Sequence, residues 1–357
     1  MSPNSPVTSL GIIEGFYGRP YSAASRAFLS GFMASGGFDF YLYAPKNDTR
    51  LRKNWRSALA GTDFADLKEF CTRLHDLGLR AGVGISPLGL DSSDSKDLDF
   101  FIKGCAALSE QLHCDLFAVL FDDIKNEHAD LGLQQRLTIC RLREALPSSI
   151  QTMLFCPSYY SPDPVLDKVF GPRPPHYLEE LTANLPAGLS MFWTGSKVVP
   201  GDIRPEDLSP EGLQNGVPLS LWDNYPVNDS KRLCDKLFTA PFPGRRNLGG
   251  KVLMHACNPM TEPILSCLAL CSLPLIYAGA TDTQISKRRL EVLDLITGGR
   301  GARFEPYLKL LQQGREHLSR AEAAALTELC RRSGTPAAQE LQDFLDGKYA
   351  FDPACLT

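Results

Sequence analysis

The stretch AVLFDDI, residues 118–124, is an apolar run that ends abruptly in two adjacent carboxylates, Asp122 and Asp123. Its β-forming residues and polar boundaries predict a buried strand. Two unpaired carboxylates inside such a strand would cost too much free energy, so we expect the pair where the strand emerges, at its carboxyl end. Ligands of α/β folds bind at this end of the strands. The stretch therefore predicts where a functional site would lie.

Seven further strand-like runs accompany this one, and helical patterns lie between them. The eight expected strands are residues 9–14, 38–43, 81–85, 116–121, 152–155, 189–193, 218–221 and 252–255. Alternation of strands and helices is typical of a parallel sheet, and eight repeats predict an α/β fold of the (β/α)8 TIM-barrel type. A doubly wound open sheet shows the same alternation and remains the alternative.

From about residue 281 the pattern changes to helices alone. We expect residues 1–280 to form the barrel and residues 281–357 to form a small C-terminal helical appendage. Two surfaces are also predicted. The helix after the fourth strand is expected to bury an apolar stripe formed by Leu133, Leu137, Cys140 and Leu146. The basic residues 287–289 are expected to form a solvated helix face.

The composition argues against several classes of protein. The formal net charge is −4 and no basic stripe is visible, so a nucleic-acid partner is not expected. No apolar run has the length of a membrane span, and the N-terminal residues show no secretory signal. The eleven cysteines lack CxxC spacing and the six histidines form no HxH or HxxxH pair. These patterns predict reduced core cysteines in a cytosolic or nuclear protein, with neither a metal site nor a cofactor.

Polar and aromatic side chains follow most of the predicted strands. They lie at residues 15–20, 44–48, 122–123, 156–160, 193–195, 222–225 and 258–259. Aromatic faces combined with Asp, Asn and Lys suit a sugar ring and its hydroxyls. Taken singly, each residue has a plainer interpretation: the two aspartates fit a Mg²⁺ site, Lys46 a surface lysine, and Trp222 a core position.

Six blocks of sequence, in this order, resemble glycoside hydrolase family 84, the β-N-acetylglucosaminidases that include protein O-GlcNAcases and bacterial enzymes named hyaluronidases. The blocks are EGFYGRPY (14–21), YLYAPKND (41–48), WR (55–56), FDD (121–123), WTG (193–195) and LWDNYPVND (221–229). The fold of that family is a (β/α)8 barrel, in agreement with the separate strand count. Arg19, Pro20, Trp55 and Arg56 are assigned to loop packing.

The resemblance implies a retaining exo-β-N-acetylglucosaminidase whose substrate supplies its own nucleophile. The 2-acetamido oxygen attacks C1 and forms an oxazoline, which is an exception to the usual two-carboxylate scheme. Asp122 would orient and polarise the acetamido N–H. Asp123 would be the general acid on the leaving oxygen and then the base for water. An adjacent pair suits these roles, because like charges raise one of the two pKa values.

The resemblance also implies seven substrate-binding residues: Gly15, Lys46, Tyr160, Trp222, Asn224, Asp229 and Asn258. Gly15 and Lys46 would bind ring hydroxyls, and Asp229 and Asn258 would bind the O4/O6 side. Asn224 and Tyr160 would contact the acetamido group, with Tyr159 as the alternative to Tyr160. Trp222 would form a wall of the acetyl pocket.

The leading expectation is removal of O-GlcNAc from Ser/Thr of proteins in the cytoplasm, and also in the nucleus. Alternative partners are GlcNAc-terminated glycans, which an amino-sugar oligosaccharide hydrolase would cleave. Two further alternatives are an inactive GlcNAc- or glycoprotein-binding barrel and a metal-dependent aldolase or isomerase. No membrane or nucleic-acid partner is expected. Because members of the family with a helical stalk can dimerise, residues 281–357 could join two copies of the chain as a homodimer.

Overall fold

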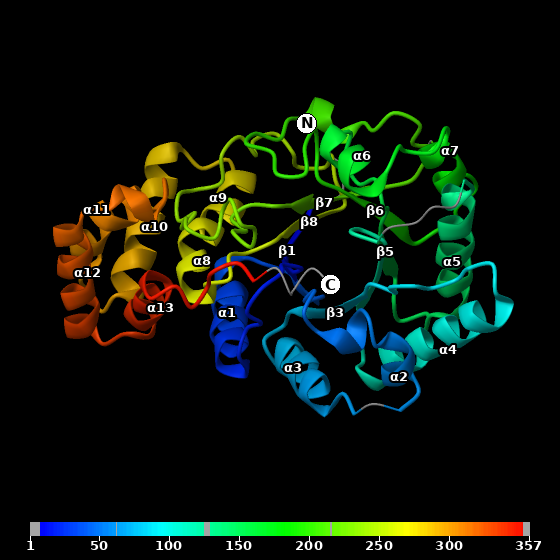
Figure 1. The fold of residues 1–357 in the computed structure, drawn as a ribbon, viewed down its shortest axis with the longest axis horizontal. Coiled ribbons are helices and arrows are strands. Elements are labelled where there is room, and N and C mark those ends of the chain that lie inside the picture. The colour runs from blue at the N-terminus through cyan, green and yellow to red at the C-terminus, as the bar shows by residue number, and fades with distance from the viewer. Residues whose placement is uncertain (1–7, 62, 125–128, 215, 353–357) are drawn as a thin grey trace.

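The computed structural model describes residues 8–352, apart from residues 62, 125–128 and 215. Across these residues, parallel strands form a closed barrel in chain order from β1 to β8 (Figure 1). The strands are β1 (Ser9–Glu14), β2 (Phe40–Tyr43), β3 (Arg80–Ile85), β4 (Leu116–Leu120), β5 (Thr152–Cys156), β6 (Leu189–Trp193), β7 (Leu219–Asp223) and β8 (Met254–Cys257). Ser9 of β1 lies opposite Met254 of β8 and closes the ring. The predicted (β/α)8 barrel is therefore confirmed, and the open-sheet alternative is wrong.

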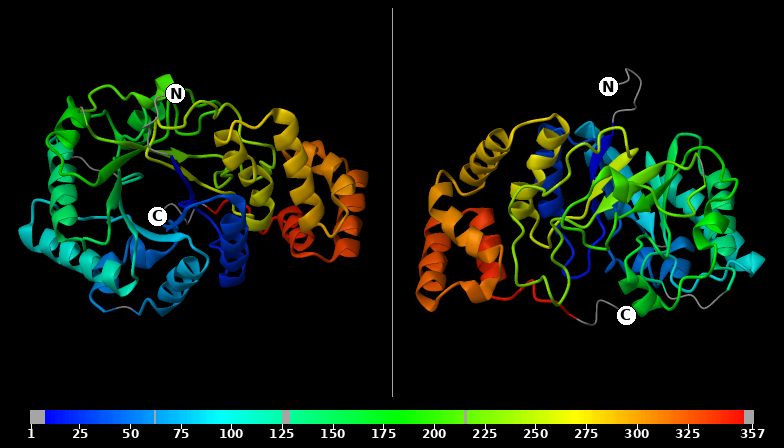
Figure 2. Two further views of the ribbon diagram at one scale, coloured as in Figure 1. Left: turned by 180° about the vertical axis from the view of Figure 1, so that it is seen from behind. Right: turned by 90° about the horizontal axis from the view of Figure 1, so that it is seen from above.

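The helices surround the barrel and extend to one side of it (Figures 1 and 2). Those within the barrel repeats are α1 (Ala23–Gly36), α2 (Trp55–Leu59), α3 (Ala65–Asp76), α4 (Ser95–Gln111), α5 (Leu131–Ala145), α6 (Pro164–Phe170), α7 (Tyr177–Thr182), α8 (Pro263–Leu270) and α9 (Ser272–Tyr277). The helices to the side are α10 (Asp282–Ile296), α11 (Gly301–Leu311), α12 (Arg320–Ser333) and α13 (Pro336–Leu345). Short 3₁₀ turns lie at Thr49–Leu51, Pro205–Leu208 and Arg315–His317.

Glycines let β3 approach the side chains that fill the barrel. A Cβ atom at Gly82 would lie 2.8 Å from the Leu42 side chain, and one at Gly84 would lie 2.8 Å from the Cβ of Ala44. Leu42 and Ala44 are both buried. Because protein interiors are close-packed, any larger residue at these two positions would displace β2.

The α10–α13 group is tied to the barrel by a buried carboxylate. Glu340 of α13 accepts hydrogen bonds from the backbone N–H groups of Leu265 (2.7 Å) and Ile264 (3.2 Å), in the first turn of α8. Those N–H groups have no partner within their own helix, so Glu340 satisfies donors that burial would otherwise leave unpaired. Burial raises the pKa of Glu340 to about 8.

The apolar stripe predicted for α5 is partly wrong. Leu133 and Leu137 are exposed, whereas Gln135 is buried. The Gln135 amide donates to Ser158 Oγ (2.7 Å) and accepts from the Tyr177 hydroxyl (2.5 Å). A polar residue can occupy the inner face because its hydrogen bonds are satisfied there, and the apolar spacing alone does not reveal this.

The solvated face predicted for residues 287–289 is correct for Lys287 and Arg288, which are exposed, but wrong for Arg289. Arg289 is buried, donates to the Thr239 carbonyl (2.6 Å) and pairs with Glu305 (2.8 Å). Its partners come from other segments, so the local sequence carries no signal for this contact.

A buried charged cluster connects β7 and β8 beneath the strand ends. Both oxygens of Asp223 accept from Arg245 (2.9 and 2.8 Å), and one also lies 3.0 Å from His255 Nε2. The side chains of all three residues are fully buried. Burial opposes ionisation of Asp223, but the charge and hydrogen bonds of Arg245 and His255 outweigh it and lower its pKa to about 2.

We expect Arg245→Met to lower the free energy of unfolding by about 3 kcal/mol, because it leaves the Asp223 charge buried without its main partner. Urea denaturation at pH 7 measures this change. Since the folded-state pKa of Asp223 lies below that of a free aspartate, the stabilisation is present above about pH 4 and is lost as the pH falls towards 2. The control is Arg331→Met, which breaks an exposed pair with Glu328. Equal midpoints for the two variants would contradict the prediction.

Candidate active site

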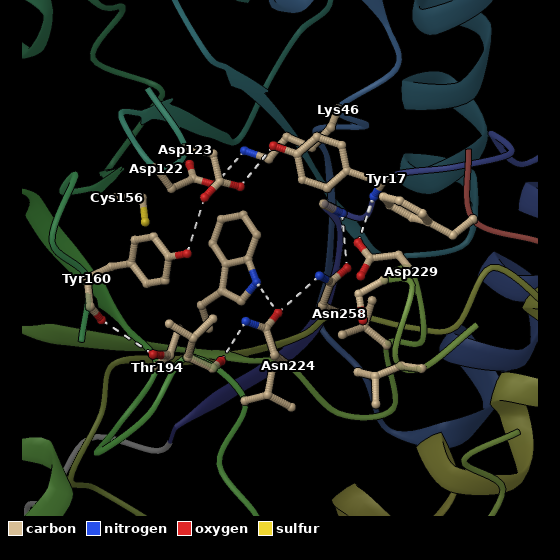
Figure 3. A pocket seen from close by; sticks show the side chains of 18 of the residues that line it. Tyr17, Lys46, Asp122, Asp123, Cys156, Tyr160, Thr194, Asn224, Asp229 and Asn258 are labelled. Carbon is tan, nitrogen blue, oxygen red and sulfur yellow. Dashed lines mark hydrogen bonds and ion pairs between the residues drawn. The ribbon is translucent and has the colours of Figure 1, made fainter. Parts of the chain in front are cut away.

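A cavity of about 310 Å³ opens at the carboxyl ends of the strands (Figure 3). All nine residues named from the sequence line it: Gly15, Lys46, Asp122, Asp123, Tyr160, Trp222, Asn224, Asp229 and Asn258. Trp222 lies in β7, and the others follow β1, β2, β4, β5, β7 and β8, which are far apart in the sequence. Closure of the barrel brings these strand ends to one face, because parallel strands all point the same way.

Asp122 and Lys46 form a buried ion pair in this cavity. Asp122 Oδ2 lies 2.5 Å from Lys46 Nζ, and both side chains are almost entirely buried. The same Nζ lies 5.6 Å from the Trp222 ring centroid, within the range of a cation–π contact. The other oxygen, Asp122 Oδ1, is buried and has no hydrogen-bond partner among the described residues. An unpaired buried carboxylate oxygen is costly, so it is a position where a donor from a ligand would be stabilised.

The backbone of Asp123 is left-handed, with φ of 58°. Aspartate tolerates this conformation better than most residues do. Its Oδ2 accepts from the Tyr17 hydroxyl (2.9 Å), and its Oδ1 accepts from the Tyr160 hydroxyl (3.3 Å). Burial raises the pKa of Asp123, and the neighbouring charge of Asp122 raises it further. This environment favours the protonated form of the carboxyl group.

Two side-chain amides and one indole form another wall of the cavity. Asn224 Oδ1 accepts from Trp222 Nε1 (3.0 Å) and from Asn258 Nδ2 (3.1 Å), and the Asn224 amide nitrogen donates to the Val198 carbonyl (2.8 Å). Asn258 Oδ1 accepts the Gly15 N–H at 3.3 Å. A Cβ atom at Gly15 would lie 2.5 Å from the Trp222 ring. Glycine is therefore required for the backbone to approach this wall.

Asp229 lies at the edge of the cavity, on the loop that follows β7. Its Oδ2 accepts the Tyr17 N–H at 2.8 Å. Burial raises the pKa of Asp229 to about 6, and the charge of Asp123 also contributes. The group is thus ionised at neutral pH, but at a cost that a hydrogen-bonding ligand would reduce.

The cavity contains Tyr160 and not Tyr159. The Tyr159 hydroxyl donates to the Gly171 carbonyl at 2.9 Å, and its ring packs edge-on against Tyr177. The residues assigned to loop packing also lie outside the cavity lining. Trp55 is fully buried, and Arg56 pairs with Asp97 at 2.6 Å.

Several residues in or beside the site were given no role from the sequence. Tyr17 follows β1 within the EGFYGRPY block, so its position offered a signal, whereas Arg52, which donates to the Tyr17 hydroxyl at 3.0 Å, offered none. Phe351, on the segment after α13, also lines the cavity. The ring centroid of Tyr349, in the same segment, lies 5.5 Å from Arg19 Cζ. This contact holds the segment beside the loop after β1. No local pattern marks Phe351, because its role depends on the path of the chain.

Within the described residues, no three His, Cys, Asp or Glu side chains are grouped as ligands for a metal ion. Ten cysteines in this part of the chain are free thiols. No described helix has the length and apolar character needed to cross a membrane.

Comparisons with known proteins identify related chains. The family model described as beta-N-acetylglucosaminidase matches residues 10–301. Protein O-GlcNAcase from Rattus norvegicus and that from Mus musculus are each 28% identical over 244 residues, which is 66% of this chain and 26% of each relative. The chain thus matches little more than a quarter of these relatives. A solved O-GlcNAc hydrolase mutant from Thermobaculum terrenum shares the fold, with a TM-score of 0.76 and 23% identity over 95% of this chain and 80% of that one.

We expect Asp229→Asn to stabilise the protein at pH 7.5 by about 2 kcal/mol, because it removes a partly buried charge and keeps an acceptor for the Tyr17 N–H. The folded-state pKa of about 6 lies above that of a free aspartate, so wild-type stability falls relative to the variant as the pH rises from about 4 to 6. Urea midpoints at pH 4 and pH 7.5 measure the effect. The exposed Asp76 on α3 gives the control, Asp76→Asn. Equal stability of Asp229→Asn and wild type at pH 7.5 would refute the prediction.

Proposed function

Because the chain belongs to the β-N-acetylglucosaminidase family, whose members are glycoside hydrolases, we propose that it is a retaining exo-β-N-acetylglucosaminidase using substrate-assisted catalysis. The observation that supports this most directly is that the two adjacent carboxylates have different hydrogen-bond partners and surroundings. Asp122 is held as an ion pair with one oxygen unpartnered, whereas Asp123 has a raised pKa and hydroxyl donors. One group is therefore suited to polarise a substrate N–H and the other to carry a proton.

In the first step, the acetamido oxygen of the substrate forms a bond to C1 while the bond from C1 to the leaving oxygen breaks. Asp123 gives its proton to that oxygen and becomes a carboxylate. Asp122 Oδ1 accepts the acetamido N–H, which increases the electron density on the attacking oxygen. Lys46 holds the other oxygen of Asp122 in an ion pair, which leaves Oδ1 for the substrate.

In the second step, water attacks C1 of the oxazoline and its proton passes to Asp123. The bond between C1 and the acetamido oxygen breaks, so the product is β-GlcNAc and Asp123 is again protonated. Two inversions at C1 give net retention of configuration. No enzyme nucleophile takes part, and the chain supplies only orientation and proton transfer.

The remaining residues of the cavity would hold the sugar ring. Gly15 and Lys46 are assigned to ring hydroxyls, and Asp229 and Asn258 to the O4/O6 side. Asn224 keeps one N–H beyond the one it donates to Val198, which suits the acetamido group. Tyr160 contacts the reacting end through Asp123. Trp222 forms a flat wall, as is common where proteins bind sugar rings.

The proposed substrates are O-GlcNAc-modified Ser and Thr residues of proteins, by analogy with relatives named Protein O-GlcNAcase. The apolar side chains of Val198, Val199, Leu233 and Phe351 also line the cavity and offer contacts for a polypeptide beyond the sugar. We extend the proposal to a cytoplasmic and nuclear location, which the free thiols favour. Residues 1–280 would be the catalytic barrel. Residues 281–357 could join two copies of the chain, since Leu290 and Leu295 of α10 are exposed.

The test is release of the aryl group from aryl β-N-acetylglucosaminides. Asp122→Ala should lower kcat/KM by about 100-fold or more, because the acetamido group loses its acceptor. Asp123→Ala should cost about 100-fold with a poor leaving group but much less with an activated one, which departs without a proton. Retention of the anomeric configuration by NMR tests the two-step mechanism.

The matched control is Asp76→Ala, on the outer surface of the barrel, which should retain full activity. Chelation by EDTA should leave the rate of hydrolysis unchanged. A loss of rate on adding EDTA would favour a metal-dependent enzyme instead. Folded wild type that binds a GlcNAc analogue without turnover would overturn the enzyme assignment in favour of a binding protein. Absence of both turnover and binding would overturn the proposal altogether.

A further inference from the structure

Tyr17 connects Arg52 to Asp123 through two hydrogen bonds. Arg52 Nη1 lies 3.0 Å from the Tyr17 hydroxyl oxygen, and that hydroxyl lies 2.9 Å from Asp123 Oδ2. The Arg52 guanidinium also lies 5.4 Å from the centroid of the Tyr17 ring. Arg52 is buried, and its side chain comes from the loop after β2. The three groups thus form a series of hydrogen bonds that links the segments after β2, β1 and β4.

The chemistry of Arg52 fixes which group donates and which accepts in this series of hydrogen bonds. A guanidinium has N–H donors and no acceptor, so the Tyr17 oxygen must accept from Arg52. The single proton of the phenol is then donated to Asp123 Oδ2. Burial raises the pKa of Tyr17 well above its ordinary value, so the phenol keeps this proton at neutral pH. A cationic donor polarises the phenol, which strengthens its own donation.

This polarity makes the two oxygens of Asp123 unequal. A carboxyl group in water can carry its proton on either oxygen. Here Oδ2 already accepts from Tyr17, and a proton placed on it would oppose the phenol proton. Oδ1 has a weaker partner, the Tyr160 hydroxyl at 3.3 Å, which can either donate or accept. The acid proton therefore belongs on Oδ1.

We propose that Tyr17, polarised by Arg52, is a positioning residue that fixes the orientation of Asp123 and reserves Oδ1 as the oxygen that carries the catalytic proton. This inference rests on the proposed glycosidase function. When Asp123 gives its proton to the leaving oxygen, the electron pair of the Oδ1–H bond stays on the carboxylate, and the Tyr17 hydrogen bond stabilises the charge. When water is activated, Oδ1 receives the proton again.

The same contact limits how far the pKa of Asp123 rises. Burial and the charge of Asp122 raise it, whereas Lys46, Tyr17 and Arg52 lower it. The titratable or charged groups around Asp123 are Asp122, Lys46, Tyr17, Arg52, Tyr160, Cys156 and Asp229. Loss of the Tyr17 hydroxyl removes a donor that favours the ionised form, so the pKa of Asp123 should rise.

The test compares Tyr17→Phe with wild type by an infrared titration of the protonated Asp123 carboxyl, whose band is assigned by its absence in Asp123→Asn. We expect Tyr17→Phe to raise the pKa of Asp123 by about one unit. Arg52→Met should give a smaller rise, and Arg52→Lys should restore part of the wild-type value because lysine also donates. The control is Tyr159→Phe, which removes a hydroxyl bonded to a backbone carbonyl outside the cavity.

Kinetics provide a second measurement. The basic limb of kcat/KM against pH should move upward in Tyr17→Phe by the same interval, and the loss of rate should be greatest with a poor leaving group. A general loss of folding would lower the rate without moving the limb. Identical Asp123 titrations in Tyr17→Phe and Tyr159→Phe would overturn the inference. If wild type shows no hydrolysis, the proposed function fails, but the titration still decides whether Tyr17 and Arg52 control Asp123.

Discussion

Two adjacent carboxylates at the end of a buried strand impose the main constraint on this structure. Asp122 and Asp123 follow β4, where both charges would repel each other in a poorly solvated site. The chain resolves this by separating their environments. Asp122 pairs with Lys46, whereas Asp123 adopts a left-handed backbone and turns toward Tyr17 and Tyr160. The two aspartates thereby lie in different environments, as is common where two carboxylates take separate roles.

Closure of the barrel brings the partners of Asp122 and Asp123 within reach of them. Lys46 reaches Asp122 from β2, and Tyr17 reaches Asp123 from the loop after β1. The loop after β7 supplies Asp229, which in turn accepts the Tyr17 backbone N–H. Each contact joins segments that only ring closure brings together. Hydrogen bonds between the ends of different strands hold the site to a fixed geometry.

The C-terminal segment packs against the barrel and contributes to the cavity. Glu340 caps α8 through two buried hydrogen bonds, so the α10–α13 group is joined to the helix that follows β8. The chain then passes Arg19 and places Phe351 at the cavity. A segment more than 200 residues from Asp122 thus shapes the same pocket.

The sequence alone determined the alternation of eight strands with helices, because apolar runs and periodicity are local properties. Closure of these strands into a ring was decided by the tertiary structure. The pattern also indicated that polar residues at the ends of parallel strands would meet at one face, and the resemblance to a known family supplied nine residues that line the cavity. Tertiary structure alone decided which groups pair. The buried positions of Gln135 and Arg289, the choice of Tyr160 over Tyr159, and the contacts of Arg52 and Phe351 depend on partners distant in the chain. Periodicity records which face of an element is buried, but hydrogen bonds to remote residues have no local period.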